Sequence, residues 1–225
     1  MKKNTSVYTY SYVALILLIF VANVMMAQRI QSGKIIYTAA YIKANEKDKL
    51  PGGLPTQCVL LFNDKLYRTE TRYENDSSIA VMITDEAAGL ITQLLNFPGN
   101  KLAVQSKIKK YYKGQSFKLQ MMTDTKKIAG YECTKIIITQ DDSLITEAWY
   151  TKSIVRTGKP NKAFHNVDGA FLEYSVALDK NGTMMKYTAT EVVEQKIADD
   201  VFQVPSTYKV CTQKKLNRML GARFF

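Results

Sequence analysis

Residues 171–193, FLEYSVALDKNGTMMKYTATEVV, predict a β-hairpin around which the rest of the chain is organised. Two runs of strand-forming residues flank the segment DKNG at 179–182. Asn-Gly is the strongest short-range signal for a tight hairpin turn, because both residues tolerate positive φ. In the first run, apolar residues recur at every second position and share one face: Leu172, Tyr174, Val176 and Leu178. This period of two is typical of a half-buried antiparallel strand.

Short strand-like runs separated by turn residues continue along the rest of the chain. Residues 33–42 form a first strand with two apolar faces, which places it in the centre of a sheet or beside a cavity. A second hairpin joins 57–62 to 65–72, and a third joins a long strand at 127–139 to its return at 144–152. Because the turn signals recur about every ten residues, we predict a mainly β fold. The regularity favours a sandwich, a barrel or a curled open antiparallel sheet, with one or two short covering helices.

Two segments interrupt the strand pattern and are expected to cover the sheet. Residues 156–168 have little β character and predict a short helix or a covering loop. Asp199 and Asp200 indicate a single helical turn, because acidic residues stabilise a helix N-terminus. After this turn, Phe202, Val204 and Tyr208 are expected to pack back on the sheet.

The N-terminus has the order of a secretory signal peptide. Lys2 and Lys3 precede an uncharged, mostly apolar run at 12–26, and the small residue Ala27 ends it. We expect cleavage after Ala27; an uncleaved anchor is the alternative, although the run is short beside the roughly 20 residues of a spanning helix. The expected product is exported to the periplasm or cell envelope. The expected parts are a signal peptide at 1–27, a single β-rich domain at 28–210 and a basic C-terminal tail at 211–225.

The charge balance favours anionic partners. The chain carries 31 basic and 20 acidic residues, a formal net charge of +11, and loss of the two lysines in the signal peptide leaves +9. An exported protein is not expected to meet nucleic acid, so anionic lipid headgroups or polysaccharide are the preferred partners. A charge that serves solubility alone is the alternative. Likewise, the basic tail at 214–225 is amphipathic, and it lies on a membrane, docks on the domain or frays.

The sequence offers little for catalysis. It has one histidine, His165, in a polar loop, and lacks the motifs of zinc proteases, nucleophile elbows and phosphate loops. We therefore expect no enzymatic activity, no cofactor and no metal. Export permits a disulfide, and the simplest expectation is one bridge and one buried free thiol. The sequence does not choose the pair among Cys58, Cys133 and Cys211.

A curled sheet with aromatic residues on several strands can enclose an apolar cavity. The side chains that would line it are expected to be Tyr37, Leu61, Tyr67, Trp149, Leu172, Tyr174 and Tyr187. The alternative is that these residues form an ordinary core.

Six short motifs in order carry a resemblance to a known family: GKIIY at 33–37, KLYR at 65–68, IAGYECTK at 128–135, EAWY at 147–150, GAFLEY at 169–174 and FQVPSTY at 202–208. With them the chain resembles the DUF4412-type exported proteins of Bacteroidetes and, more distantly, the LolA/LolB/LppX lipoprotein-carrier group. This resemblance implies a half-open barrel that holds a lipid or a lipoprotein acyl chain in the periplasm. The competing hypothesis is a non-catalytic interaction or structural module of the envelope with a filled core.

Overall fold

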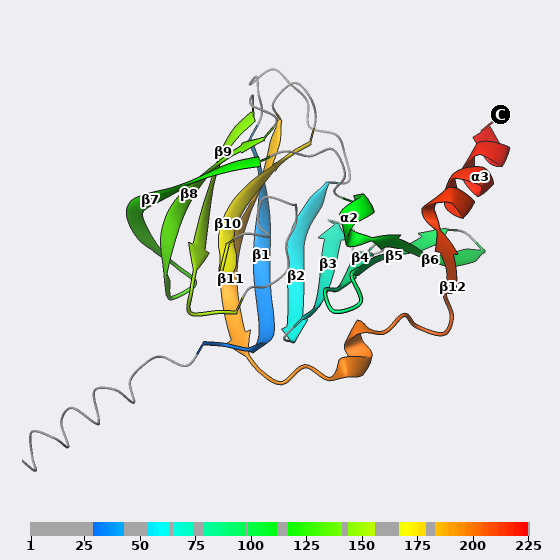
Figure 1. Cartoon of the computed structure of the whole chain (residues 1–225), viewed down its shortest axis with the longest axis horizontal. Helices are drawn as coiled ribbons and strands as arrows, with labels where there is room; N and C mark the ends of the chain where they lie inside the picture. The colour runs from blue at the N-terminus through cyan, green and yellow to red at the C-terminus, as the bar shows by residue number, and fades with distance from the viewer. Residues whose placement is uncertain are drawn as a thin grey trace, which may run out of the picture.

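The computed structural model describes residues 29–42, 54–63, 65–73, 79–97, 99–111, 117–140, 144–155, 167–178 and 183–224. Over these residues the chain forms one open sheet in the order β12-β6-β5-β4-β3-β2-β1-β11-β10-β9-β8-β7 (Figure 1). Neighbouring strands are antiparallel except β12 and β6, which are parallel. The predicted class, a mainly β fold with an open antiparallel sheet and short helices, is confirmed.

The elements follow the chain as a meander with few interruptions. Their bounds are β1 (Ser32–Ile42), β2 (Pro55–Asn63), β3 (Leu66–Tyr73), β4 (Ile79–Asp85), β5 (Leu90–Phe97), β6 (Asn100–Lys107), α2 (Ile108–Tyr111), β7 (Phe117–Ile128), β8 (Tyr131–Gln140), β9 (Leu144–Thr151), β10 (Ala170–Ala177), β11 (Met184–Glu194), the 3-10 helix η2 (Asp199–Phe202), β12 (Lys209–Thr212) and α3 (Gln213–Phe224).

The hairpin predicted at 171–193 is confirmed as β10 and β11. Tyr174 lies opposite Tyr187, and Val176 lies opposite Met185. The Asn-Gly turn itself, at 179–182, lies outside the described residues. An irregularity in the pairing of β10 with β9, between Phe171 and Glu173, interrupts the simple alternation. As a result, the first five residues of β10 are all buried.

The other predicted hairpins are confirmed in part. β2 pairs with β3 as expected, and β1 lies centrally between β2 and β11. The single long strand predicted over 127–139 is wrong. The chain turns back at Ala129 and Gly130, whose φ angles are 48° and 86°, so that β7 ends and β8 begins there. Positive φ at both central residues is the geometry of a tight hairpin turn.

The sheet has two parts that differ in curvature (Figure 1). In the curled half, which consists of β7 to β11 with β1 and β2, the strands bend round until β7 contacts β11. Their inner faces share one large apolar core, with contributions from Ile35, Phe62, Ile136 and Leu172 among others. The open half consists of β3 to β6 and β12, and it spreads away from the curl.

The open half is covered by the C-terminal part of the chain. Phe202 is buried against Ile83, Leu94 and Ala103, and Val204 and Tyr208 pack beside it. This confirms the helical turn and the return to the sheet that were predicted for residues 198–208. We call residues 195–208 the strap.

The basic tail docks on the sheet through a smaller apolar cluster. Leu216 of α3 is buried with Cys211, against Leu102 and Val104 of β6. The neighbouring β6 residue Ala103 belongs to the strap's core, so the strap and α3 cover opposite faces of β6. β12 begins at residue 209 and ends at 212, so it crosses the boundary that was predicted at residue 210 between the β-rich domain and the tail.

Two glycines mark places where the backbones of neighbouring strands approach closely. A Cβ at Gly33 would lie 2.4 Å from the carbonyl oxygen of Val193, and one at Gly169 would lie 2.2 Å from that of Thr151. Gly169 also has a φ of 138°, which L-residues with side chains rarely adopt. These positions begin the motifs GKIIY and GAFLEY, so the motifs have a physical reason in the packing of β1 and β10.

No helix within the described ranges has both the length and the apolar character needed to span a membrane. The predicted signal peptide and the covering segment expected at 156–168 lie outside those ranges, apart from Val167 and Asp168.

Candidate functional site

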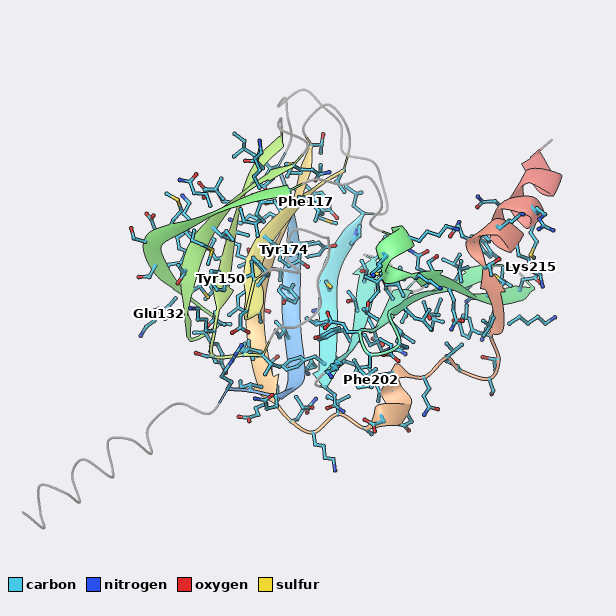
Figure 2. The ribbon with its side chains drawn as sticks, in the orientation of Figure 1. Phe117, Glu132, Tyr150, Tyr174, Phe202 and Lys215 are labelled. Atoms are coloured by element: carbon cyan, nitrogen blue, oxygen red, sulfur yellow. The ribbon has the colours of Figure 1, made fainter. Side chains whose placement is uncertain are left out.

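Three of the predicted cavity residues form an aromatic cluster inside the curled half, and Figure 2 labels one of them, Tyr174. Tyr37 comes from β1, Tyr174 from β10 and Tyr187 from β11. The ring centroids of Tyr174 and Tyr187 are 5.2 Å apart, and the Tyr37 ring packs edge-on against both, at 5.9 and 6.4 Å. These are favourable separations for aromatic pairs, so the rings contact one another rather than border an open space.

The tyrosine hydroxyls of this cluster are neutral at ordinary pH. Tyr37 donates a hydrogen bond of 2.9 Å from its hydroxyl to the carbonyl oxygen of Phe171. Burial, and secondarily the nearby thiols of Cys58 and Cys133, raise the pKa of Tyr37 well above its usual value. Burial likewise raises the pKa of Tyr174 and of Tyr187. The cluster therefore carries no charge with which to bind an ionic group.

Two further predicted residues, Leu172 and Tyr67, belong to the same core. The remaining two, Leu61 and Trp149, are only partly buried, and of these Trp149 packs against this core. Leu61 points to the opposite face of β2 from Leu60 and packs near the strap's core. Strand alternation requires this, because Leu60 and Leu61 are successive residues.

Trp149, the other exception, lies half-buried on the outer face of the curled half. The Nζ atom of Lys126 is 4.3 Å from the centroid of its ring, and that of Lys135 is 6.0 Å away. The neighbouring residues Ala148 and Tyr150 are buried in the core instead. The indole therefore serves as a cation–π platform outside the barrel.

The core of the curled half becomes less buried toward one end. Along β1, burial falls from Ile35 and Tyr37 to Ala39 and Tyr41, and along β10 it falls toward Val176. The Tyr41 hydroxyl donates to the carbonyl oxygen of Pro55 and lies 3.4 Å from the sulfur of Met185. We call this end, defined by Ala39, Tyr41 and Val176, the mouth.

A buried carboxylate on the outer face of β10 joins three strands, and the sequence analysis did not select it. Both Lys126 of β7 and Lys186 of β11 place their Nζ atoms 2.9 Å from Oε1 of Glu173. Thr188 donates to Oε2 at 3.2 Å. Burial pushes the pKa of Glu173 upward, but the hydrogen bonds and charges of the two lysines outweigh it and lower the pKa. Glu173 is thus an ionised clamp; its one sequence signal was the position of a charged residue between Leu172 and Tyr174 in a strand.

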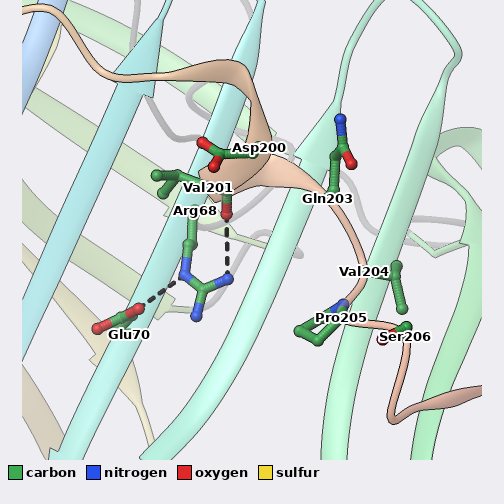
Figure 3. Close-up of a pocket in the computed structure, with 8 residues that line it drawn as sticks. All are labelled: Arg68, Glu70, Asp200, Val201, Gln203, Val204, Pro205 and Ser206. Atoms are coloured by element: carbon green, nitrogen blue, oxygen red, sulfur yellow. Dashed lines mark hydrogen bonds and ion pairs between the residues drawn. The ribbon is translucent and has the colours of Figure 1, made fainter.

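An open hollow of about 600 Å³ lies where the strap crosses β3 (Figure 3). Arg68 stands at its centre, with Nε donating to Oε1 of Glu70 at 2.7 Å and Nη1 donating to the carbonyl oxygen of Val201 at 3.1 Å. The guanidinium therefore holds the strap on the sheet. The other lining residues, all from the strap, are Asp200, Gln203, Val204, Pro205 and Ser206.

The expected disulfide is absent, because Cys58, Cys133 and Cys211 are all free and buried. They lie on three strands that are not neighbours, β2, β8 and β12, so none faces another across a ladder. Burial is the main cause that raises the pKa of the Cys58 thiol to about 12 and that of Cys133 to about 11. Neither thiol is a ready nucleophile at neutral pH.

In the part of the chain that the structure describes, no group of three His, Cys, Asp or Glu side chains lies close enough together to bind a metal ion. His165 lies outside that part.

The comparisons with known proteins bear on the fold. No family model and no curated protein matches the chain. Among solved structures it is similar to PNGF-II in two crystal forms, each with a TM-score of 0.53, at 17% and 18% identity. These matches cover 85% of this chain and 33% of that one, so the chain spans about a third of the length of PNGF-II. A LolA superfamily protein from Nitrosomonas europaea also matches, with a TM-score of 0.35 and 9% identity, over 79% of this chain and 93% of that one. At these identities the likeness to PNGF-II concerns the fold alone, and the family suggested by the sequence motifs stays a prediction.

Proposed function

We propose that the protein is a non-catalytic binding module of the cell envelope, whose curled half is a filled scaffold and whose partners bind on the outside. One observation carries the proposal. Five of the seven side chains expected to line a cavity are almost fully buried: Tyr37 (2% exposed), Tyr67 (3%), Leu172 (0%), Tyr174 (7%) and Tyr187 (7%). Side chains that border a space wide enough for an acyl chain would keep surface open to that space. Their close burial favours a packed core.

The ionisable groups near this core support a role without catalysis. General acid–base chemistry needs a group whose pKa lies near the working pH and which reaches the substrate. The tyrosines and the thiols of Cys58 and Cys133 have raised pKa values and stay protonated. Glu173 is ionised, but both of its oxygens are engaged by neighbouring side chains. These groups contribute rigidity rather than a proton-transfer path.

Native mass spectrometry tests the proposal. The purified protein is expected to have the mass of the polypeptide alone, before and after organic extraction. A lipid of fixed mass at one copy per chain would contradict the filled scaffold. A Tyr174→Ala variant provides the positive control, because an apolar cavity made in a core stays dry and takes up benzene or xenon. Xenon uptake by this variant shows that the assay detects a cavity.

A second candidate function, binding of a lipid or acyl chain, is favoured by the mouth. Ala39, Tyr41 and Val176 are only half-buried there, beside the packed tyrosines. An apolar chain that enters at this end would extend the core. Titration with a fluorescent fatty acid tests this candidate. It predicts saturable binding that Val176→Trp blocks and that Ala177→Trp, at an exposed position on the opposite face of β10, leaves unchanged; no binding by the wild type rules it out.

The envelope location rests on the order of residues 1–27 and has its own test. Expression in a Gram-negative host should yield a periplasmic protein that begins at Gln28. Recovery of the full-length chain in the membrane fraction would instead support the uncleaved anchor.

A further inference from the structure

Two stretches of sequence that lack acidic residues meet at one edge of the sheet. Residues 87–123 contain six lysines and no Asp or Glu, and residues 201–225 contain three lysines, two arginines and no Asp or Glu. More than 75 residues separate them along the chain, yet β12 pairs in parallel with β6, Lys209 opposite Leu102. The fold therefore gathers basic side chains at this edge without acids between them.

The side chains that make up this edge are exposed, and among the residues that the structure describes they have no acidic partner. We call them the basic edge: Lys101, Lys107, Lys209, Lys214, Lys215 and Arg218. None of the six takes part in an ion pair with the described part of the chain, in contrast to Lys126, Lys135 and Lys186 on the curled half. Lys101 alone has a noted partner, the ring of Tyr208, 5.9 Å from its Nζ atom. Their charge is therefore available to an external anion.

The way in which α3 docks fixes what the edge presents. Leu216 is buried against β6 and Met219 packs beside it, so these two apolar side chains of the helix face the sheet. Lys214, Lys215 and Arg218 lie exposed on the rest of the helix (Figure 2 labels Lys215 at this edge). Val210, on β12 between Lys209 and Cys211, is 55% exposed. The edge thus combines exposed cations with one exposed apolar side chain.

We propose that the basic edge docks the protein on a membrane surface that contains anionic lipid headgroups. Lys209 of β12 and Lys214, Lys215 and Arg218 of α3 lie together along the edge strand of the sheet, and each Lys or Arg near a surface of phosphate groups strengthens binding. Because Leu216 and Met219 already pack against β6, the contact that we propose is electrostatic rather than insertion of these side chains into the membrane. The inference rests on the proposed function, since it names the outer surface that a filled scaffold would use.

Vesicle flotation with the full chain tests the basic edge. Vesicles of phosphatidylcholine with 30% phosphatidylglycerol are compared with pure phosphatidylcholine, at 50 mM and 500 mM NaCl. The N-terminal segment, which carries Lys2 and Lys3, is the same in the wild type and in every variant, so its contribution cancels when the variants are compared. We expect the anionic vesicles to bind at least about tenfold better at low salt, and this preference to disappear at high salt as the charges are screened.

Matched variants locate the effect. Lys209→Gln, Lys214→Gln, Lys215→Gln and Arg218→Gln together should abolish the preference for anionic vesicles. The control replaces four exposed lysines elsewhere, Lys65, Lys127, Lys152 and Lys196, by Gln and loses the same charge; it should keep the preference within about twofold. Both variants should keep the wild-type circular dichroism, because none of these side chains is buried.

Three results would overturn the proposal: no preference of the wild type for anionic vesicles, equal losses in the two variants, or tighter binding of alginate than of vesicles, which would make the partner a polysaccharide. Native mass spectrometry on the same samples distinguishes a failure of the basic-edge proposal from a failure of the filled-scaffold proposal. A retained lipid would contradict the scaffold, whereas a lost vesicle preference with no retained lipid would contradict the basic edge alone.

Discussion

The curled half and the open half belong to one sheet but bury their apolar faces by different means. In the curled half the strands face one another, so side chains from β1, β2, β8, β10 and β11 fill a common interior. In the open half no strand faces another, and the apolar residues are covered by the strap on one face and by α3 near β6 on the other. The comparison teaches that the open half needs the last 30 residues of the chain to bury its apolar residues, whereas the strands of the curled half bury theirs against one another.

The largest expected effect is in the curled half. Leu172→Ala removes a side chain with no exposed surface and should lower the free energy of unfolding by about 4 kcal/mol, since surrounding strands prevent collapse of the cavity. Urea denaturation followed by circular dichroism measures it. The same substitution at the exposed Leu178 should cost less than about 0.5 kcal/mol. Similar losses in the two variants would mean that the interior is not closely packed.

The next largest effect is a loss of stability that is confined to the open half. Phe202→Ala removes the anchor of the strap and should lower the free energy of unfolding by about 3 kcal/mol, because neighbouring side chains can partly fill this shallower site. Hydrogen exchange should accelerate in β4, β5 and β6, and stay near wild type in β10 and β11. Equal acceleration of hydrogen exchange in both halves would contradict the view that only the open half depends on the strap.

A smaller effect concerns the clamp outside the curled half. The pKa of Glu173 is lower in the folded chain than its usual 4.5. Its contribution is therefore complete above pH 4.5 and is lost as the pH falls through the folded pKa. Glu173→Gln should lower the free energy of unfolding at pH 7 by about 1 kcal/mol, since the two lysines stay partly solvated. The gap between wild type and variant should narrow below pH 4.5; a constant gap would mean that the carboxylate charge contributes nothing.

The smallest effect concerns the three thiols. Their reactivity is expected to differ between the denatured and the folded chain, with little effect on the stability of the fold. Ellman's reagent should find three free thiols in the denatured chain without reductant, since no bridge forms. In the folded chain, Cys58 and Cys133 should resist iodoacetamide at pH 8, because their pKa values of about 12 and 11 keep the thiolate scarce. One titratable thiol in the denatured chain would instead reveal a bridge.

The features that the sequence predicted well are local. Alternation and the Asn-Gly signal predicted the pairing of β10 with β11, and the turn residues marked most of the meander. The strand predicted over 127–139 was wrong because the turn at Ala129 and Gly130 places an alanine at positive φ, which tertiary packing imposes against its preference. Gly130 within an otherwise regular strand pattern was the available warning.

The contacts that the sequence did not predict join distant segments. Glu173 binds Lys126, which is 47 residues away, and β12 joins β6 across more than 100 residues. Periodicity reports which face a residue occupies and not which strand lies beside it. Periodicity alone does show that Leu61 and Trp149 point to the opposite face from their sequence neighbours. Those neighbours are buried in the interior, so the two side chains lie outside it.

The filled interior of the curled half is tested most directly by nuclear magnetic resonance of the protein labelled with ¹³C at its tyrosine rings and titrated with dodecanoate. We predict that the resonances of Tyr37, Tyr174 and Tyr187 stay unchanged up to the solubility limit of the fatty acid, because these rings already contact one another. Saturable shifts of all three resonances at one equivalent would show that an acyl chain enters the interior, and would contradict the filled scaffold.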